Sequence, residues 1–243
     1  MKKIGAFFDI DGTIYREALL IQHFKKLMDY EVIDRALWYT DVKKVYEEWK
    51  KRYGDYEEYL ETLAPIYLDN LKGEDRKFVN YIADQVIKTS GDQVYKYSRE
   101  RLKWHKEKGH LIFFISGSPD FLVSRIAAKY EATDYRGSVY KVDSDEKFTG
   151  ELIPMWDSSS KNNVISGLIE EYDIDLKKSY AYGDTTGDLS MLKKMGNPIA
   201  INPNKALLES IKSNEKLSEK IKIIVERKDV IYSLDSSVTI LDY

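Results

Sequence analysis

The sequence predicts an α/β fold in which an open, mostly parallel sheet carries a helical domain inserted after its first strand. Short β-prone runs alternate with helical patterns over most of the chain, which requires parallel strands joined by right-handed crossovers. One long segment, residues 17–92, interrupts this alternation with helical periodicity and few strand signals. The 243 residues are enough for a large domain with a smaller insertion. We therefore predict a core domain formed by residues 1–16 and 93–243 and a helical cap domain formed by residues 17–92.

The first strand is predicted over residues 4–10, a buried β-prone run that ends at the turn sequence DGT. The inserted segment begins with apolar residues three and four apart, which is typical of a helix. Thr40 is expected to cap the following helix, and Asp55 to begin a capping box for the next one. We expect Pro65 to close that helix and a further helix to end at Ser90.

The alternation of strands and helices resumes after the insertion. Ser118 suits an N-cap and Pro119 a first helical position, so this pair is expected to open a helix. An alternating pattern with two glycines predicts a hairpin over residues 135–152, and the last fifteen residues give no clear pattern. The other predicted helices are 98–108, 161–172, 188–195 and 207–211, and the other predicted strands are 110–115, 178–182, 198–201 and 222–226.

The composition excludes several classes of protein. Hydrophobic residues make up 43% and charged residues 33%, as in folded soluble proteins. The formal net charge is −3, so neither nucleic acid nor a membrane is an expected partner. Cys is absent and His occurs three times, which excludes thiol chemistry and leaves little for a His-based metal site. Asp9 interrupts the first apolar run too early for a signal peptide, so we expect a cytoplasmic protein.

Polar residues follow the predicted strands of the core. In an open α/β sheet, ligands bind beyond the carboxyl ends of the strands, so these side chains are expected to meet there. They are Asp9 and Asp11 after the first strand, Ser116 after the second, Lys161 at the start of a helix, and Asp184 and Asp188 after the third strand.

This set of residue types is suited to phosphoryl transfer. Four converging carboxylates would repel one another unless a cation neutralised them, and oxygen ligands favour Mg²⁺. Of Asp9 and Asp11, one could attack phosphorus while the other transfers a proton. Backbone amides around Ser116 would attract an anion, and Lys161 would stabilise a pentavalent oxyanion. The sequence therefore predicts a covalent aspartyl phosphate and a Mg²⁺ cofactor.

Four short motifs resemble those of the haloacid dehalogenase superfamily, in the order and at the intervals of that family. They are DIDGT with Asp9 and Asp11, FFISGS with Ser116, the lysine at Lys161, and GDTTGD with Asp184 and Asp188. The resemblance implies a Rossmann-like core, and the helical insert is similar to the cap of the phosphoserine-phosphatase-like subgroup. We therefore expect a phosphatase that acts on a small-molecule phosphate ester, as a monomer or homodimer.

The resemblance also implies the role of each site residue. Asp9 would be the nucleophile, and Asp11 would protonate the leaving oxygen and later deprotonate water. Mg²⁺ would be held by Asp9, the carbonyl of Asp11 and Asp184, with Asp188 close by or acting through water. The residues expected to bind substrate are Gly12, Thr13, Arg16, Glu17 and Gly117.

Two departures from the subgroup bear on the substrate. Ala18 stands where phosphoserine phosphatases carry a Glu that holds the substrate amine, and Gly187 replaces the usual Asn before the last Asp of the fourth motif. A true phosphoserine phosphatase that uses other cap residues remains an alternative. Another is a phosphorelay receiver-like domain, which also combines acidic residues, a hydroxyl and a lysine. The second acidic pair and the large insert favour a hydrolase over a receiver.

Aromatic residues recur at near-helical spacing in the insert, from Trp38 to Tyr67. We interpret them as the stripe that packs the cap helices together. The alternative is that one or two of them line the substrate pocket.

Overall fold

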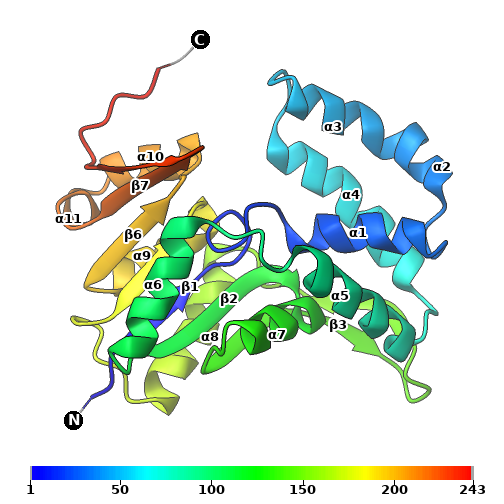
Figure 1. Ribbon diagram of the computed structural model, residues 1–243, viewed down its shortest axis with the longest axis horizontal. Helices are drawn as coiled ribbons and strands as arrows, with labels where there is room; N and C mark the ends of the chain where they lie inside the picture. Colours follow the sequence, from blue (N-terminus) through cyan, green and yellow to red (C-terminus); the bar gives the residue numbers. More distant parts are fainter. Residues whose placement is uncertain (1, 242–243) are drawn as a thin grey trace. The chain divides into compact units, whose positions relative to one another are not determined.

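The computed structural model describes residues 2–241 and confirms the predicted fold class (Figure 1). The strands in chain order are β1 (Gly5–Phe8), β2 (Leu111–Pro119), β3 (Asp134–Val142), β4 (Phe148–Ile153), β5 (Tyr180–Gly183), β6 (Asn197–Ile201), β7 (Lys222–Arg227) and β8 (Val230–Leu234). Their order across the sheet is β4-β3-β2-β1-β5-β6-β7-β8. The pairs from β3 to β7 are parallel, whereas β3–β4 and β7–β8 are antiparallel. No helix within residues 2–241 is long and apolar enough to cross a membrane.

The chain divides into two compact units. The second unit consists of residues Leu20–Thr89 and Val139–Ile153, and the rest of the described chain forms the first unit. The strands of the first unit are β1, β2, the start of β3, β5, β6, β7 and β8. Its helices are α6 (Lys96–Glu107), α7 (Asp120–Lys129), α8 (Ser158–Glu171), the 3₁₀ turn η2 (Thr186–Asp188), α9 (Leu189–Lys194), α10 (Lys205–Lys212) and α11 (Glu215–Ser218).

Apolar side chains cover both faces of the central strands because successive residues of a strand point to opposite sides. On one face, Phe7 and Phe113 stack with ring centroids 4.6 Å apart and belong to the core that α8, α9 and α10 complete. On the other face, Phe8 stacks on Tyr182 and meets the edge of His105 from α6. The central strands are thereby fixed from both sides.

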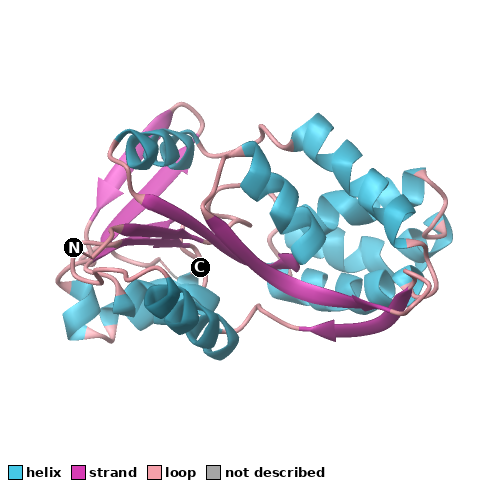
Figure 2. Cartoon of the chain, turned by 90° about the horizontal axis from the view of Figure 1, so that it is seen from below, coloured by secondary structure: helices cyan, strands magenta, loops and turns pink. Residues whose placement is uncertain are grey.

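The second unit is mostly helical, as the cyan ribbons of Figure 2 show. It contains most of α1 (Leu19–Asp29), α2 (Arg35–Leu37), the π-helical turn η1 (Trp38–Val42), α3 (Lys43–Lys50), α4 (Tyr56–Leu71), nearly all of α5 (Arg76–Ser90) and β4 (Phe148–Ile153). The aromatic stripe packs these helices together, with Trp49 stacked on Tyr59 at 5.7 Å and Tyr46 against both.

The hairpin of β3 and β4 differs from the sequence expectation, which placed it in the core domain. The structure groups residues 139–153 with the helices of the second unit. The reason is backbone hydrogen bonding: Gly73 N donates to the Phe148 carbonyl at 2.7 Å, and Phe148 N donates to the Glu74 carbonyl at 3.0 Å. Such pairing joins residues far apart in the sequence, which no local pattern reveals.

Three local expectations for the helices are wrong. Pro65 lies inside α4 and does not close it, so the helix tolerates the loss of one backbone donor. Asp55 is the N-cap of α4, but its side chain makes no capping hydrogen bond. Thr40 lies inside the π-helical turn, where its hydroxyl donates back to the Ala36 carbonyl at 3.2 Å.

One expectation for the core is corrected by a single residue, and one segment that was left unassigned contains a strand. A helix follows Ser118 and Pro119 as expected, but it begins one residue later, with Pro119 as its N-cap, because β2 continues through Pro119 and pairs there with Ser138 of β3. This helix is α7, which begins at Asp120. The C-terminal segment to which no element was assigned contains β8, which pairs with β7 from Arg227 and Val230 onward.

Candidate active site

Asp9 follows β1 and lies at the edge of the sheet where β2 and β5 also end. Its backbone N–H donates to the Tyr182 carbonyl of β5 at 2.9 Å, which fixes the first loop to the neighbouring strand. Because β1, β2 and β5 are parallel neighbours, their carboxyl ends bring Asp9, Ser116 and Asp184 to one edge. The structure therefore places the predicted polar residues in one region of the first unit.

Lys161 joins two of the carboxylates. Its Nζ lies 2.6 Å from Asp9 Oδ1 and 2.7 Å from Asp188 Oδ1, and all three side chains are buried. The lysine reaches this position from the first turn of α8, whose N-cap Asp157 accepts hydrogen bonds from the backbone N–H groups of Ser159 and Ser160. An ammonium shared by two carboxylates in this way is held rigidly at the site.

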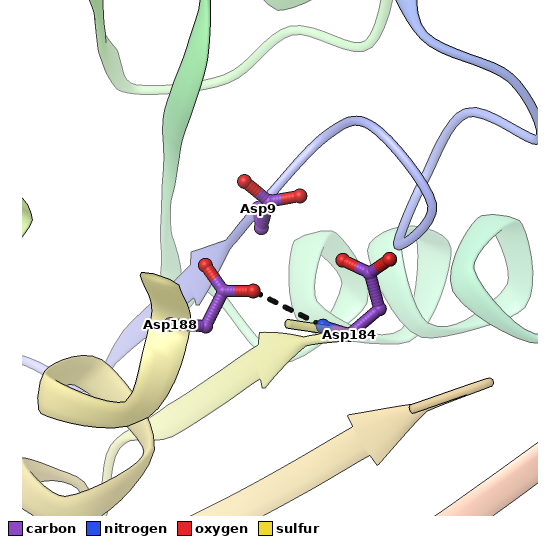
Figure 3. Close-up of side chains that lie close together, drawn as sticks. All are labelled: Asp9, Asp184 and Asp188. Atoms are coloured by element: carbon purple, nitrogen blue, oxygen red, sulfur yellow. Dashed lines mark hydrogen bonds between the residues drawn. The ribbon is translucent and has the colours of Figure 1, made fainter. Parts of the chain in front are cut away.

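Asp188 also shapes the loop that carries Asp184. Its Oδ2 accepts the backbone N–H groups of Asp184 at 3.1 Å and Thr185 at 3.2 Å, and Thr185 completes a capping box with it (Figure 3). Gly183 has no side chain here because a Cβ at that position would collide with the Asp188 side chain. Both carboxylate oxygens of Asp188 thus have partners within the protein.

Asp184 completes a group of three carboxylates. One oxygen from each of Asp9, Asp184 and Asp188 lies within 4.8 Å of the others (Figure 3). Thr13 donates its hydroxyl to Asp184 Oδ1 at 3.1 Å, and Gly12 adopts a φ of +84° beside the same carboxylate. A Cβ at Gly12 would overlap Asp184 Oδ2, so both the backbone conformation and the space require glycine.

Asp11 lies in a separate set of hydrogen bonds. Its Oδ2 accepts the hydroxyls of Ser118 at 2.6 Å and Ser116 at 3.2 Å, and its Oδ1 accepts the Leu19 backbone N–H at 2.7 Å. Ser116 Oγ in turn accepts the Ser118 backbone N–H at 3.1 Å. The Asp11 carboxylate is therefore oriented by two serines of β2, and it does not belong to the group of three.

Sequence reasoning missed Ser118, which we expected only to cap a helix. A signal was available, because residues two apart on a strand point to the same side, and Ser116 was already a candidate. That signal required β2 to continue past residue 115, which the Ser-Pro pair concealed.

Burial and mutual repulsion dominate the electrostatics of the site. Burial raises the pKa of Asp9 well above its ordinary value, and the charges of Asp188 and Asp11 add to this effect while Lys161 opposes it. Burial and the charge of Asp9 likewise raise the pKa of Asp184. Burial would lower the pKa of Lys161, but its two carboxylate partners outweigh this and raise it, so the ammonium stays charged.

This donor set fits a hard divalent cation. Lys161 is already shared between Asp9 and Asp188, and the Asp184 carboxylate accepts the hydroxyl of Thr13. Carboxylate oxygens at this spacing are the ligands that Mg²⁺ prefers, and a cation would counter the repulsion that raises the pKa values of Asp9 and Asp184.

The other residues expected to bind substrate lie around this region of the first unit. Gly117 follows Ser116 in β2, and its backbone carbonyl accepts the Ser138 hydroxyl at 2.7 Å. Arg16 is exposed, with its guanidinium 6.0 Å from the centre of the Tyr95 ring, and Glu17 is exposed beside it. Glu17 does not belong to the group of three carboxylates.

Comparison with known proteins identifies the family. The sequence model of the haloacid dehalogenase-like hydrolase family matches residues 6–193, which include all four motifs. The phosphoserine phosphatase SerB1 of Mycobacterium tuberculosis is 29% identical over 127 residues, which span 52% of this chain and 40% of that protein. The histidinol-phosphatase of Neisseria meningitidis serogroup C is 22% identical over 85% of this chain and 94% of its own length.

Solved structures show the same fold. A structure described as a phospho-aspartyl intermediate analogue of phosphoserine phosphatase superposes with a TM-score of 0.59 at 21% identity, over 94% of this chain and 96% of that one. The resemblance drawn from the four motifs is therefore confirmed, including the likeness to phosphoserine phosphatases. The chain belongs to the haloacid dehalogenase-like hydrolase family.

Proposed function

We propose that this chain is a Mg²⁺-dependent phosphatase that hydrolyses a small-molecule phosphate monoester through a phosphorylated Asp9. The observation that carries the proposal is the buried ammonium of Lys161, bonded to Asp9 and Asp188 beside the carboxylate of Asp184. Membership of a hydrolase family and relatives named as phosphatases support it.

In the first step, Asp9 attacks phosphorus. Lys161 holds Asp9 Oδ1, so Oδ2 is the oxygen that forms the new bond to phosphorus. The bond from phosphorus to the ester oxygen breaks, and Asp11 gives its proton to that leaving oxygen. The raised pKa of Asp11, which follows from its burial, favours the protonated acid that this step requires.

In the second step, water hydrolyses the phosphorylated Asp9. Asp11, now ionised, takes a proton from the water, whose oxygen bonds to phosphorus and displaces the Asp9 oxygen. The hydroxyls of Ser118 and Ser116 keep the Asp11 carboxylate in one orientation during both steps. Ser116 and the Gly12, Thr13 and Gly117 backbone would cradle the phosphoryl oxygens.

Asp9 and Asp184 would hold the Mg²⁺ ion, with the Asp11 carbonyl as a further ligand and Asp188 acting through its neighbours or through water. When bound, the ion neutralises charge on the phosphoryl group and on the carboxylates. Lys161 adds a second positive charge for the oxyanion and is already in place without the ion.

The names of the relatives differ, so they do not identify one substrate. Ala18 is only 4% exposed and offers no carboxylate for an amine, which speaks against phosphoserine unless other residues take that role. We assign the helical second unit the role of a cap that selects the substrate, and Arg16 and Glu17 a place near the leaving group. We further propose that the enzyme works in the cytoplasm as a monomer or homodimer.

The proposal is tested by release of p-nitrophenol from p-nitrophenyl phosphate. We expect release with Mg²⁺, its loss in EDTA and its return when Mg²⁺ is added in excess. A screen of phosphorylated metabolites, with phosphoserine included, then ranks substrates by kcat/KM. Turnover that persists unchanged in EDTA would contradict the proposal, and so would turnover that survives in Asp9→Asn.

A further inference from the structure

Trp156 lies against two of the motifs in a way that the motifs themselves do not predict. A Cβ built on Gly117 would lie 3.0 Å from Trp156 Cβ and 3.2 Å from its Cα, and a Cβ built on Gly187 would lie 2.6 Å from the Trp156 carbonyl oxygen. The Trp156 residue thus passes directly beside both glycines. One of them follows Ser116 and the other precedes Asp188, so Trp156 borders the carboxylate site within the first unit.

This contact explains the departure of the fourth motif from its family. Neither Gly117 nor Gly187 has a positive φ, so space and not backbone conformation favours glycine there: a Cβ at 187 would overlap the Trp156 carbonyl oxygen, and one at 117 would pack tightly against Trp156 Cβ. An Asn at 187 would bring its Cβ against the backbone oxygen of Trp156, which cannot move aside as a side chain could. The glycine at 187 and the close approach of Trp156 are therefore parts of one arrangement.

The backbone on either side of Trp156 is fixed. Met155 is buried, and its N–H donates to Ser138 Oγ at 3.0 Å. Asp157 caps α8, the helix that carries Lys161. Because both neighbours are anchored, the backbone of Trp156 is held in place, and on one side it is held by the cap of the helix that carries Lys161.

The side chain of Trp156, in contrast, has no partner. It is 55% exposed, and among residues 2–241 it makes no hydrogen bond, ring contact or cation contact. An exposed indole, carried on a fixed backbone beside Gly117 and Gly187, gives a flat apolar surface at little cost in conformational entropy.

We propose that Trp156 forms a subsite for the leaving group and selects phosphate monoesters whose leaving group carries a flat ring. This inference rests on the proposed phosphatase function and names a substrate class for the same site. Stacking on the indole supplies the recognition, and the absence of a carboxylate at Ala18 removes the group that would favour an aliphatic amino acid.

The test compares phenyl phosphate with glycerol 1-phosphate in the presence of Mg²⁺. We expect the ratio of kcat/KM for the two esters to fall on the order of tenfold in Trp156→Ala, mainly through the KM for phenyl phosphate. Trp156→Phe keeps a flat ring and is expected to retain most of the ratio. Tyr232→Ala, which removes an exposed aromatic side chain of β8, is the matched control and should leave the ratio unchanged.

A binding measurement provides a second readout. In Asp9→Asn, phenyl phosphate is expected to change the tryptophan fluorescence, and this change should vanish when Trp156→Phe is added. An unchanged ratio in Trp156→Ala, with phosphate still released from both esters, would overturn this inference alone. Absence of metal-dependent phosphate release from any ester in wild type would overturn the proposed function and this inference with it.

Discussion

Two buried polar clusters lie close together in the first unit, and burial affects their ionisable groups differently. One is the carboxylate site beyond β1 and β5. The other lies between α6 and the sheet, where His105 Nε2 is 2.8 Å from the Tyr182 hydroxyl and His105 Nδ1 is 2.8 Å from His110 Nδ1. Tyr182 belongs to both, because its hydroxyl lies in the histidine cluster and its backbone carbonyl accepts the N–H of Asp9.

In the histidine cluster, the polar groups form hydrogen bonds with one another. Burial lowers the pKa of His105 to about 3, with Arg101 and His110 adding to the effect, so the ring is neutral at pH 7. Arg101 donates to the Tyr182 hydroxyl at 3.0 Å and lies over the Trp104 ring at 3.9 Å. Both ring nitrogens of His105 have hydrogen-bond partners, and the neutral ring needs no counter-charge.

The carboxylate site holds buried acids that repel one another. Burial raises the pKa of Asp9 and of Asp184, and Lys161 is the ammonium bonded directly to this group. Both clusters are buried, so burial alone does not indicate a functional site. The carboxylate site is distinguished by the mutual repulsion of its buried acids, which raises their pKa values although Lys161 opposes it.

Removing the proposed nucleophile should separate the two clusters most clearly. Asp9→Asn keeps the shape of the side chain but cannot form the acyl phosphate, so kcat should fall about a thousandfold or more. Phosphate release under saturating substrate measures the loss. His105→Gln, a substitution in the other cluster, serves as the control and should keep kcat within a few-fold of wild type.

Lys161 should show the next largest effect. Lys161→Met removes the ammonium shared by Asp9 and Asp188, and we expect kcat to fall on the order of a hundredfold or more, as for the loss of one oxyanion-stabilising group. Circular dichroism must show a folded variant. A folded Lys161→Met enzyme with wild-type kcat would mean that the ammonium has only a structural role.

His105 should make the stability of the protein depend on pH. Its pKa is lower in the folded chain, at about 3, than the ordinary 6.5, so the unfolded chain binds a proton first as the pH falls. This contribution is present above pH 6.5 and is lost as the pH falls toward 3. Between pH 7 and pH 5 it amounts to about 2 kcal/mol of unfolding free energy.

Urea unfolding of wild type and His105→Gln at these two pH values isolates that contribution. The difference in unfolding free energy between pH 7 and pH 5 should be smaller in the variant by about 2 kcal/mol. An identical pH dependence in the two proteins would show that His105 is not held neutral by burial.

Ser118 should give the smallest effect on the chemistry. Ser118→Ala removes the 2.6 Å hydrogen bond to Asp11 but leaves the bond from Ser116, so we expect about a tenfold loss of kcat for an alkyl phosphate. The loss should be smaller for p-nitrophenyl phosphate, whose leaving group needs little protonation. Equal losses for both esters would argue that Ser118 acts on folding and not through Asp11.

The sequence predicted those parts of the molecule that depend on local patterns. Asp9, Asp184 and Lys161 were found because strand ends and helix starts in an α/β alternation must meet at one edge of the sheet. The helix through Pro65 was missed because tertiary packing overrides a local helix breaker. The place of the hairpin around Phe148 depends on backbone pairing with residues 73 and 74, which leaves no local signal.

The site residues likewise differ in whether a local sequence pattern reveals them. Ser118 was misassigned because the Ser-Pro pair suits a helix start as well as the end of a strand. Trp156 gave no signal at all, since its contacts with Gly117 and Gly187 join three segments distant in sequence. Gly187 itself was visible as a departure from the family, and only the structure gives the reason.

The central claim is that Asp9 becomes phosphorylated during turnover. Wild-type protein turning over p-nitrophenyl phosphate with Mg²⁺ would be quenched in acid, digested and mapped by mass spectrometry. We predict one added phosphoryl group on the peptide that contains Asp9, present only with Mg²⁺ and absent from Asp9→Asn. Steady turnover with a phosphoryl group on another residue, or with the label persisting in Asp9→Asn, would contradict the account.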